Sequence, residues 1–530
     1  MMGPKPRVKY DFIVVGAGSA GCVLAGRLSE KPDVRVLLLE AGTAREPFAS
    51  RVPAAFSKMF KTRHDWAYFT EPEPELQRRR LYVPRGKLLG GSSAMNAMIY
   101  IRGNPLDYDG WASEGAEGWS YADVVPFFER AEDQGRGKLP GHGVGGPLRV
   151  EDLRTLNPMS TAFVEACAQI GIATNDDFNS GTQEGAGYYQ VTQKGGKRWS
   201  AANAYLFPAL GRPNLVALRG AHTLRVVFDE DRAVGVEYFH DGKKTVARAS
   251  REVLLSAGAI GSPQLLMLSG IGPAQDLERL GIPVVANVEG VGQNLQDHPV
   301  VGLAFACKKP ISLLKAEGLG ALVRYAVSKT GPLTSNVAEA GAFVRSSPAL
   351  SAPDLQFHFA PAFFVEHGFV KPEGHGFSLG PALITPASRG HLTLASADPF
   401  APPRIHGNSV SEGADMKGLV AGLKLARAIA FAPAFDRYRG PEYLRGAKIE
   451  TEAEMEAHVR ATAELLYHPC GTCKMGKDAR SVVDSELRVH QVRGLRVADA
   501  SVMPTVTRGN TNAPTIMIAE RLAAWLGASS

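Results

Sequence analysis

A glycine-rich turn near the N-terminus limits the fold of this chain more than any other feature. The run at 11–15 reads DFIVV and predicts a buried strand, GAGSAG follows at 16–21, and the next residues have the spacing of a helix. A second apolar run at 34–39 leads directly into Glu40, nineteen residues after Gly21. These parts together predict a βαβ unit of about 30 residues in which the glycine turn opens the helix.

Each part of this unit has a chemical reason. Gly16 permits the tight turn, Gly18 lets a pyrophosphate approach the backbone, and Gly21 lets helix and strand pack closely. The helix N-terminus offers N–H groups and the positive end of its dipole to phosphates. Glu40 can accept hydrogen bonds from both ribose hydroxyls, and its charge would repel a 2′-phosphate. The unit therefore predicts dinucleotide binding, with FAD and NAD both open at this point.

Two further glycine pairs, Gly270–Gly272 and Gly290–Gly292, do not continue as GxGxxG. We interpret both as turns, because the spacing that opens a phosphate-binding helix is missing. The sequence therefore offers no visible segment for a second fold that would bind a nicotinamide nucleotide. This argues against a reductase with two nucleotides.

Length and composition narrow the class of protein. The 530 residues exceed the usual domain size of about 100–150, so we expect two or more substructures. The 45% hydrophobic and 21% charged residues are typical of globular proteins. A net charge of +6 is weak, and we interpret the run Arg78–Arg80 as a solvated loop, so no nucleic-acid partner is expected. Five cysteines, an odd number, favour a reducing compartment over a disulfide framework.

Targeting signals are not visible. The N-terminal segment has no apolar region before a small-residue cleavage site, and no stretch of about 18 apolar residues occurs that could span a membrane. We expect a cytoplasmic protein. Peripheral contact with the inner face of the membrane and the oligomeric state both stay open.

The fold class expected is mixed α/β. Paired strands are predicted at 214–256. Residues 300–460 show a different pattern, alternating strands with one helix near 415–431, and Thr515–Leu526 predicts an amphipathic helix. The glycine-rich stretch 134–147 predicts an exposed loop. We interpret the chain as a Rossmann-like nucleotide domain assembled from non-contiguous segments, with an inserted substrate domain of antiparallel sheet and helices. The expected boundaries are 8–150, 191–300 and 465–530 for the nucleotide domain, and 151–190 and 301–464 for the substrate domain.

Two further blocks carry chemistry. Residues 84–103 (PRGKLLGGSSAMNAMIYIRG) offer many hydrogen-bond donors on a backbone that a flat ligand can approach, and their apolar end predicts a path into the interior. Residues 468–476 read HPCGTCKMG, in which His468 is a candidate general base near neutral pH.

The CxxC pair of that block, Cys470 and Cys473, suggests metal or redox chemistry at first sight. A zinc site needs two more ligands and no companion pair exists, and the βαβ context of a thioredoxin motif is absent. We interpret both cysteines as packing residues and predict no metal site.

Taken together, these blocks resemble the glucose–methanol–choline (GMC) oxidoreductases, an FAD-dependent family that oxidises alcohols. The resemblance runs along essentially the whole chain, through DFIVVGAGSAG, PRGKLLGGSSAMNAMIYIRGNPLDYDGW, SAGAIGSPQLLMLSGIG, GVGQNLQDH, YHPCGTCKMG and GNTNAPTIMIAER. Within the family, GYYQVTQKGGKRWSAANAYL and LTSNVAEAGAFVRSSP are most similar to bacterial aliphatic and polyethylene-glycol alcohol dehydrogenases. Bacterial choline dehydrogenases are the next most similar.

The resemblance implies a mechanism. His468 stands where the family has its general base, and Asn512 is the expected equivalent of the family's His or Asn partner. The base would take the proton of the substrate hydroxyl while a hydride passes to flavin N5, and Asn512 would donate a hydrogen bond to the developing alkoxide. Because the flavin takes the hydride, no metal is required.

The resemblance also implies the residues that contact FAD. They come from the glycine turn, the Gly-Ser block and the C-terminal blocks: Gly16, Gly18, Ser19, Ala20, Gly21, Glu40, Ala41, Trp66, Arg85, Gly90, Gly91, Ser92, Asn96, Ala97, Met98, Ile99, Thr223, Ala257, Asp499, Ala500, Asn512 and Thr515. Some choline-oxidising relatives attach FAD through a histidine immediately before the asparagine of the GGSS block. Here that residue is Met95, so non-covalent FAD is expected.

Three functions stay open. The first is oxidation of an uncharged primary alcohol, aliphatic or aromatic, to the aldehyde, which the aromatic residues of 355–370 (Phe357, Phe359, Phe363, Phe364 and Phe369) suit. The second is oxidation of choline or another cationic alcohol, with Glu339 as a candidate contact, although a structural role fits that carboxylate better. The third is a flavoprotein without alcohol chemistry, against which the pair His468 and Asn512 argues. Oxygen and a quinone are both candidates for the electron acceptor.

Overall fold

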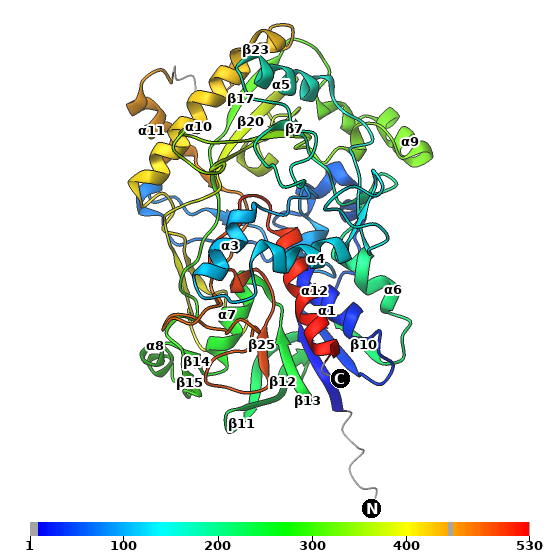
Figure 1. Ribbon diagram of the computed structural model, residues 1–530, viewed down its shortest axis with the longest axis vertical. Coiled ribbons are helices and arrows are strands. Elements are labelled where there is room, and N and C mark those ends of the chain that lie inside the picture. The colour runs from blue at the N-terminus through cyan, green and yellow to red at the C-terminus, as the bar shows by residue number, and fades with distance from the viewer. Residues whose placement is uncertain (1–8, 444–448, 529–530) are drawn as a thin grey trace, which may run out of the picture.

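Two large β-sheets organise the chain, one in each half of the molecule (Figure 1). The computed structural model describes residues 9–443 and 449–528. The first eight residues, which include the expected start of the first domain, lie outside this description, as do the last two residues of the expected C-terminal segment.

The first sheet is a parallel core with an antiparallel extension. Its order is β10-β2-β1-β13-β12-β11, with β25 paired to β13, and the pairings among β10, β2, β1, β13 and β25 are parallel. The strands are β1 (Lys9–Val15), β2 (Val36–Glu40), β10 (Leu215–Arg219), β11 (His222–Asp229), β12 (Arg232–His240), β13 (Lys243–Leu255) and β25 (Leu495–Val497). Every residue of β2 is buried, as expected where helices cover both faces of a parallel sheet.

Two helices secure the start of this sheet. Helix α1 (Ser19–Leu28) connects β1 to β2 and packs against α12 (Asn512–Ala528), so the two ends of the chain meet here (Figure 1). Helix α7 (Gly258–Leu268) follows β13. The expected βαβ unit is therefore present, and the paired strands expected at 214–256 are β10 to β13.

The second sheet is antiparallel and lies in the other half of the molecule (Figure 1). Its order is β23-β17-β20-β19-β18-β7, and β16 pairs with β20 and β24. The strands are β7 (Gly185–Tyr188), β16 (Pro299–Val300), β17 (Leu303–Cys307), β18 (Ala340–Val344), β19 (Leu355–Ala360), β20 (Gly376–Leu383), β23 (Arg439–Tyr443) and β24 (Glu464–Leu465). Helices α5 (Pro158–Gln169) and α10 (Gly413–Phe431) pack on one face of this sheet and share an apolar core with it. The mixed fold class, with segments of distant sequence joined in one sheet, is confirmed.

Shorter elements complete the two halves. The remaining helices are α2 (Phe48–Arg51), α3 (Pro105–Ser113), α4 (Tyr121–Ala131), α6 (Phe207–Ala209), α8 (Ala274–Arg279), α9 (Leu319–Ser328) and α11 (Glu452–Thr462). Short strand pairs are β3 (Tyr68–Phe69) with β4 (Tyr82–Val83), β5 (Glu132–Gln134) with β6 (Leu148–Val150), β8 (Gln193–Lys194) with β9 (Lys197–Arg198), β14 (Ile271–Gly272) with β15 (Ala286–Asn287), and β21 (His391–Thr393) with β22 (Arg404–His406). Within the described ranges, no helix has the length and apolar character needed to cross a membrane.

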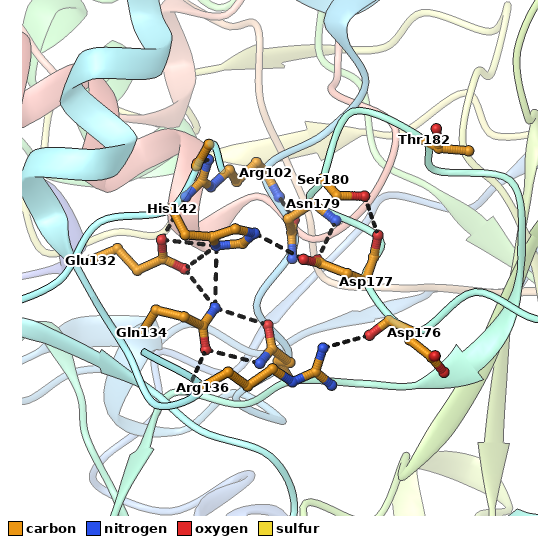
Figure 2. Close-up of polar contacts among 12 residues, drawn as sticks. Arg102, Glu132, Gln134, Arg136, His142, Asp176, Asp177, Asn179, Ser180 and Thr182 are labelled. Carbon is orange, nitrogen blue, oxygen red and sulfur yellow. Dashed lines mark hydrogen bonds and ion pairs between the residues drawn. The ribbon is translucent and has the colours of Figure 1, made fainter. Parts of the chain in front are cut away.

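The glycine-rich loop 134–147 is exposed only in part. Gln134, His142 and Gly143 are buried, and His142 lies between two carboxylates (Figure 2). Its Nδ1 lies 3.1 Å from Glu132 and its Nε2 lies 2.8 Å from Asp177, while Arg102 donates to Glu132 at 2.6 Å. Burial acts against the charged ring, but the two carboxylates outweigh it and raise the pKa of His142 to about 9. The loop is therefore anchored by a charged histidine rather than free along its length.

Candidate active site

A cavity of about 850 Å³ lies between the two sheets. The residues that directly follow β1, β2, β13 and β25 line it, because the carboxyl ends of these parallel strands meet at one edge of the first sheet. Its other wall comes from the second sheet, including residues of β17, β19 and β20. The volume lies in the upper part of the range of about 300–1,000 Å³ that ligand pockets have.

The nucleotide end of the cavity is shaped by close backbone contacts. A Cβ atom added at Gly16 would lie 2.5 Å from the carbonyl oxygen of Ser256. One added at Gly91 would lie 2.7 Å from the Cα of Gly18, and Gly90 donates its N–H to the Ala17 carbonyl at 2.8 Å. The Gly-Ser block therefore lies directly on the glycine turn, at a distance that side chains would prevent.

Glu40 ends β2 and faces this cavity from a buried position. Its Oε2 accepts the N–H of Ala17 at 2.9 Å and its Oε1 accepts the N–H of Gly42 at 2.8 Å. Burial raises the pKa of Glu40 to about 7, although both N–H donors act in the opposite direction. Since a carboxylate has about four acceptor positions, two stay available for the hydroxyls of a ribose.

The expected cofactor residues gather around one cavity. The following line it: Gly16, Gly18, Ser19, Ala20, Glu40, Ala41, Trp66, Arg85, Gly91, Ser92, Asn96, Ala97, Met98, Ile99, Thr223, Ala257, Asp499, Ala500, Asn512 and Thr515. Gly21 and Gly90 do not line it. Gly21 instead packs against the turn, where an added Cβ would lie 1.8 Å from the Gly16 carbonyl oxygen.

These residues fit a dinucleotide such as FAD. Helix α1 begins at the cavity wall and has no side-chain cap at Gly18, so the positive end of its dipole faces the cavity. The close-packed glycines leave room for a pyrophosphate, and the Glu40 carboxylate suits a ribose. Thr223 and Trp66 line the same cavity and would be available to the adenine.

At the opposite end of the cavity, His468 lies between two polar side chains. Its Nδ1 is 3.0 Å from Nδ1 of His298, and its Nε2 is 3.2 Å from the amide nitrogen of Asn510. Asp297 accepts the backbone N–H of both histidines at 2.8 Å, which holds the two rings in an edge-to-face arrangement. The loop that carries His298 thus fixes the position of His468.

The structure pairs His468 with a different asparagine from the one expected. Asn512 accepts a hydrogen bond from Ser19 at 2.7 Å, at the nucleotide end of the cavity. Asn510 precedes helix α12, whereas Asn512 begins it. The chain turns into the helix between these two residues, so they serve opposite ends of the site and Asn512 does not meet His468.

A chain of hydrogen bonds sets the orientation of the Asn510 amide. The Tyr189 hydroxyl donates to the Phe357 carbonyl at 2.7 Å and so accepts from the Gln356 amide at 3.1 Å. The same Gln356 amide donates to Oδ1 of Asn510 at 3.1 Å, which turns the Asn510 nitrogen toward His468. Nε2 of His468 is then the acceptor, and its ring proton lies on Nδ1 for the bond to His298.

The electrostatics of this end favour a neutral imidazole. Burial, together with the rings of His298 and His358 and the guanidinium of Arg85, holds the pKa of His468 well below 6.5. Burial also raises the pKa of Asp297 to about 7, against the effect of its N–H donors and Arg85. At neutral pH the lone pair of His468 Nε2 is therefore available to take a proton.

Two histidines of this site were not singled out from the sequence. His298 closes the GVGQNLQDH block, and His358 lies on β19. Side chains alternate along a strand, so Phe357 and Phe359 pack into the core of the second sheet while His358 faces the cavity. Within the described part of the chain, neither nitrogen of the His358 ring has a hydrogen-bond partner. A polar residue between two phenylalanines in LQFHFA is the signal that could have identified it.

The expected aromatic pocket is only partly present. Phe364 and Phe369 line the cavity, but Phe357 and Phe359 lie in the core and Phe363 packs against Tyr443 at 5.2 Å. Other aromatic side chains also line the cavity: Phe56, Phe60, Trp66, Tyr68, Phe69, Tyr82 and Tyr467. These come from segments far from 355–370 in the sequence, which is why composition alone did not identify them.

Glu339 lies outside the cavity, in a structural position. It is buried and accepts hydrogen bonds from Ser335 at 2.6 Å, Ser160 at 2.7 Å and the N–H of Asn157 at 2.8 Å. Its carboxylate is therefore occupied within the protein and does not line the wall that a cationic substrate would contact.

The two cysteines of the CxxC pair are buried thiols without a disulfide. Burial raises the pKa of both Cys470 and Cys473 far above that of a free thiol. In the part of the chain described, no cluster of His, Cys, Asp and Glu side chains is arranged to hold a metal ion.

Comparison with known proteins agrees with this geometry. Two models described as GMC oxidoreductase match residues 10–300 and 386–519. The chain is 46% identical to an alcohol dehydrogenase (acceptor) of Pseudomonas putida over 525 residues, which cover 97% of this chain and 95% of that protein. It is 46% identical to the mitochondrial choline dehydrogenase of Homo sapiens over 539 residues, covering 98% and 90%.

Solved structures with a similar fold are also known. A formate oxidase of Aspergillus oryzae RIB40, studied for its FAD modification, superposes with a TM-score of 0.93 at 27% identity over 99% of both chains. The chain therefore belongs to the GMC oxidoreductase family and is an FAD-dependent oxidoreductase, as the blocks of its sequence indicated.

Proposed function

We propose that the chain oxidises an uncharged primary alcohol, aliphatic or aromatic, to the aldehyde. The observation that carries this proposal is the position of His468. Its Nε2 accepts from Asn510 and faces the cavity that also holds the glycine turn and Glu40. A neutral base, whose Nε2 lone pair a substrate hydroxyl can take over from the Asn510 amide, thus shares one cavity with the dinucleotide site.

The chemistry needs such a base. An unactivated alcohol is about as weak an acid as water, with a pKa of ~16, so it loses hydride readily only when a base takes the hydroxyl proton. His468 receives that proton at Nε2, where the substrate hydroxyl replaces the Asn510 amide. The Asn510 amide then donates to the oxygen as negative charge develops on it. A bound FAD supplies the acceptor for the hydride.

We propose that FAD is held without a covalent bond. Met95 takes the place of the linking histidine and is buried among Phe56, Met59, Phe60 and Tyr82. The Met95 thioether has no nucleophilic nitrogen that could form a covalent bond to FAD. Acid or heat should release free FAD into the supernatant, whereas yellow colour that stays with the precipitate would overturn this part of the proposal.

Charges on the cavity wall favour a neutral substrate over choline. Away from Glu40 and Asp499, the ionic side chains of the wall are Lys61, Arg79, Arg80, Arg85, Glu366 and Glu464. Arg79 is paired with Glu464 and Arg80 with Glu71, which leaves Lys61 and Arg85 against Glu366. A quaternary ammonium would lose its hydration there without a surplus of negative charge, and Glu339 lies elsewhere. Oxidation of a cationic alcohol stays the alternative because choline dehydrogenases are close relatives.

The remaining parts of the proposal concern the surroundings. We propose a small-molecule alcohol as substrate and either oxygen or a quinone as electron acceptor, with no nucleic-acid partner. All five cysteines are free thiols, which supports a cytoplasmic location.

The substrate is tested by comparing butanol, hexanol, benzyl alcohol and choline with an artificial electron acceptor. If the wall is apolar, kcat/KM should rise about fourfold per added CH₂ until the cavity is full, since each buried CH₂ contributes about 0.8 kcal/mol. Choline should be the poorest of the four. A preference for choline of about tenfold or more, some 1.4 kcal/mol, would replace the neutral alcohol with the cationic one.

A second measurement distinguishes oxidation of either kind of alcohol, neutral or cationic, from a flavoprotein without alcohol chemistry. Anaerobic addition of a good alcohol should bleach the flavin of the holoenzyme. If none of a broad set of alcohols bleaches it, the proposed reaction is wrong.

A further inference from the structure

Helix α9 lies on the surface and turns its apolar side outward. Its sequence is LGALVRYAVS, and Tyr325 is its one buried residue. Leu319 is 77% exposed, Val327 83% and Val323 55%. An amphipathic helix normally turns its apolar side toward the core, whereas α9 exposes this side. In Figure 1, α9 projects from the side of the half that contains the second sheet.

The inner side of α9 accounts for its attachment. Tyr325 packs with Val52, Ala55 and Leu333, and its hydroxyl donates to the Arg51 carbonyl at 3.4 Å. The outward side chains of α9 are exposed instead. Together with the exposed Leu314, which precedes the helix, they form what we call the α9 patch: Leu314, Leu319, Leu322, Val323 and Val327. A contiguous exposed apolar patch of this kind marks an interaction surface.

The α9 patch is bordered by positive charge. Lys315 and Arg324 are exposed and form no ion pair with any residue that the structure describes. Lys329 donates to the last carbonyls of the helix, at Tyr325 and Ala326. The one acidic residue of segment 312–330, Glu317, is paired with Lys371 at 2.7 Å.

This charge selects among the surfaces that could cover the patch. A second copy of the chain, related by a two-fold axis, would bring Lys315 and Arg324 of both copies into one interface with no free acid from this segment, and like charges across an interface are costly. An anionic bilayer meets both features, because apolar side chains enter the boundary between headgroups and acyl chains while lysine and arginine contact phosphates.

We propose that the α9 patch docks onto the surface of an anionic lipid bilayer. The contact is interfacial, with Leu319, Leu322, Val323 and Val327 inserted and with Lys315 and Arg324 at the level of the headgroups. The proposal rests on this surface and not on the reaction proposed above.

The cavity lies close to the inner side of α9. Phe56 belongs to the 3-10 helix Pro53–Met59, whose Ala55 packs with Tyr325, and Phe56 lines the cavity. Lys371, the partner of Glu317, follows directly after the cavity-lining segment that contains Phe369. Docking would therefore bring this wall of the active site close to the lipid.

The test is co-sedimentation of the holoenzyme with vesicles of phosphatidylcholine alone and of phosphatidylcholine mixed with phosphatidylglycerol. The wild type should bind the anionic vesicles, and added salt should weaken this binding. Leu319→Glu combined with Val323→Glu should reduce binding about tenfold or more, because the inserted side chains become charged. Lys315→Ala and Arg324→Ala should each reduce it about fivefold.

A matched control is Val144→Glu, since Val144 is 56% exposed and lies outside this surface. It should bind vesicles as the wild type does. All variants should keep the flavin spectrum and the activity with a soluble electron acceptor, which shows that they fold.

Three results would overturn the proposal. The wild type could fail to bind either vesicle, or the double glutamate variant could bind as the wild type does. The third is a concentration-dependent dimer, seen by light scattering, that the double variant abolishes, because the patch would then join two copies of the chain.

Discussion

The two ends of the cavity are built in different ways. The nucleotide end is mostly backbone: Gly91 lies against Gly18, and Gly16 against the Ser256 carbonyl, at distances that a side chain would prevent. The catalytic end is made of side chains from distant segments, with His298, His468 and Asn510 joined by hydrogen bonds of 3.0 and 3.2 Å.

This difference indicates what each end tolerates. At the nucleotide end, backbone N–H groups and a helix dipole do not depend on the identity of a residue beyond the need for glycine. At the catalytic end, one proton position depends on a chain of amide and hydroxyl orientations that runs from Tyr189 to His468. We therefore expect single substitutions to separate binding of FAD from chemistry.

The largest effect is expected for His468→Ala. The rate of flavin reduction by a good alcohol should fall by about 10²–10⁴, the usual contribution of a positioned base. The flavin should stay bound, because no contact at the nucleotide end is removed. Anaerobic stopped-flow measurement of flavin absorbance gives the rate.

His490→Ala is the control, since His490 is half-buried and does not line the cavity. It should reduce its flavin as the wild type does. Near-wild-type reduction in His468→Ala would mean that another group takes the proton.

The next effect distinguishes the two asparagines. Asn510→Ala should lower the rate of flavin reduction by about 10²–10³, as loss of one donor to a developing oxyanion does. Asn512→Ala should instead weaken retention of FAD, because it disturbs the contact with Ser19 beside the start of α1, and should leave the rate of the loaded enzyme within a few-fold of the wild type.

Measuring both rate and flavin content in the same pair of variants keeps these roles apart. The opposite assignment, with Asn512→Ala slow and Asn510→Ala deficient in FAD, would contradict the geometry described here.

Glu40→Ala should weaken FAD binding about ten- to hundredfold, the range expected for charge-assisted hydrogen bonds. The variant also leaves the N–H groups of Ala17 and Gly42 without their acceptor. Once saturated with FAD, it should reduce its flavin at the wild-type rate. Titration of the apoprotein by flavin fluorescence measures the affinity, and an unchanged affinity would remove Glu40 from the ribose site.

The smallest effect concerns a polar cluster that belongs to neither end. Because the pKa of His142 is raised to about 9, the charged ring stabilises the folded chain most fully below 6.5, and this contribution is lost as pH rises through about 9. His142→Gln should lower Tm by about 2–4 °C at pH below 6.5 and less at alkaline pH. Flavin reduction should not change. Equal destabilisation at both pH values would mean that the charge contributes nothing.

The difference between the two ends of the cavity also explains how much of the site could be predicted from the sequence. The nucleotide end is contiguous in the chain, so strand, turn, helix and Glu40 were predicted from local spacing alone, and the mixed fold class followed. The catalytic end depends on contacts between distant segments. GNTNAP contains two asparagines, and only the start of α12 determines that Asn510 meets His468 while Asn512 meets Ser19.

The second sheet shows the same limit. The composition of 355–370 indicated an aromatic pocket, but the alternation of β19 sends Phe357 and Phe359 into the core and brings His358 to the cavity. Likewise, His142 was expected in an exposed loop, and its burial depends on carboxylates contributed by β5 and by the 175–182 segment. A sequence pattern alone does not tell whether a side chain lies in the core or at the cavity, because this depends on which distant segment packs against each face.

The central claim is that His468 acts as a neutral base in a buried, hydrogen-bonded position. Its most direct test is the pH dependence of anaerobic flavin reduction by an alcohol. A base works only when unprotonated, so the rate should fall as pH decreases through its pKa. Since burial holds the pKa of His468 well below 6.5, the rate should stay at its plateau at pH 6.5 and decline only in more acidic solution. A decline centred at or above 6.5, or the same decline in His468→Ala, would contradict the account.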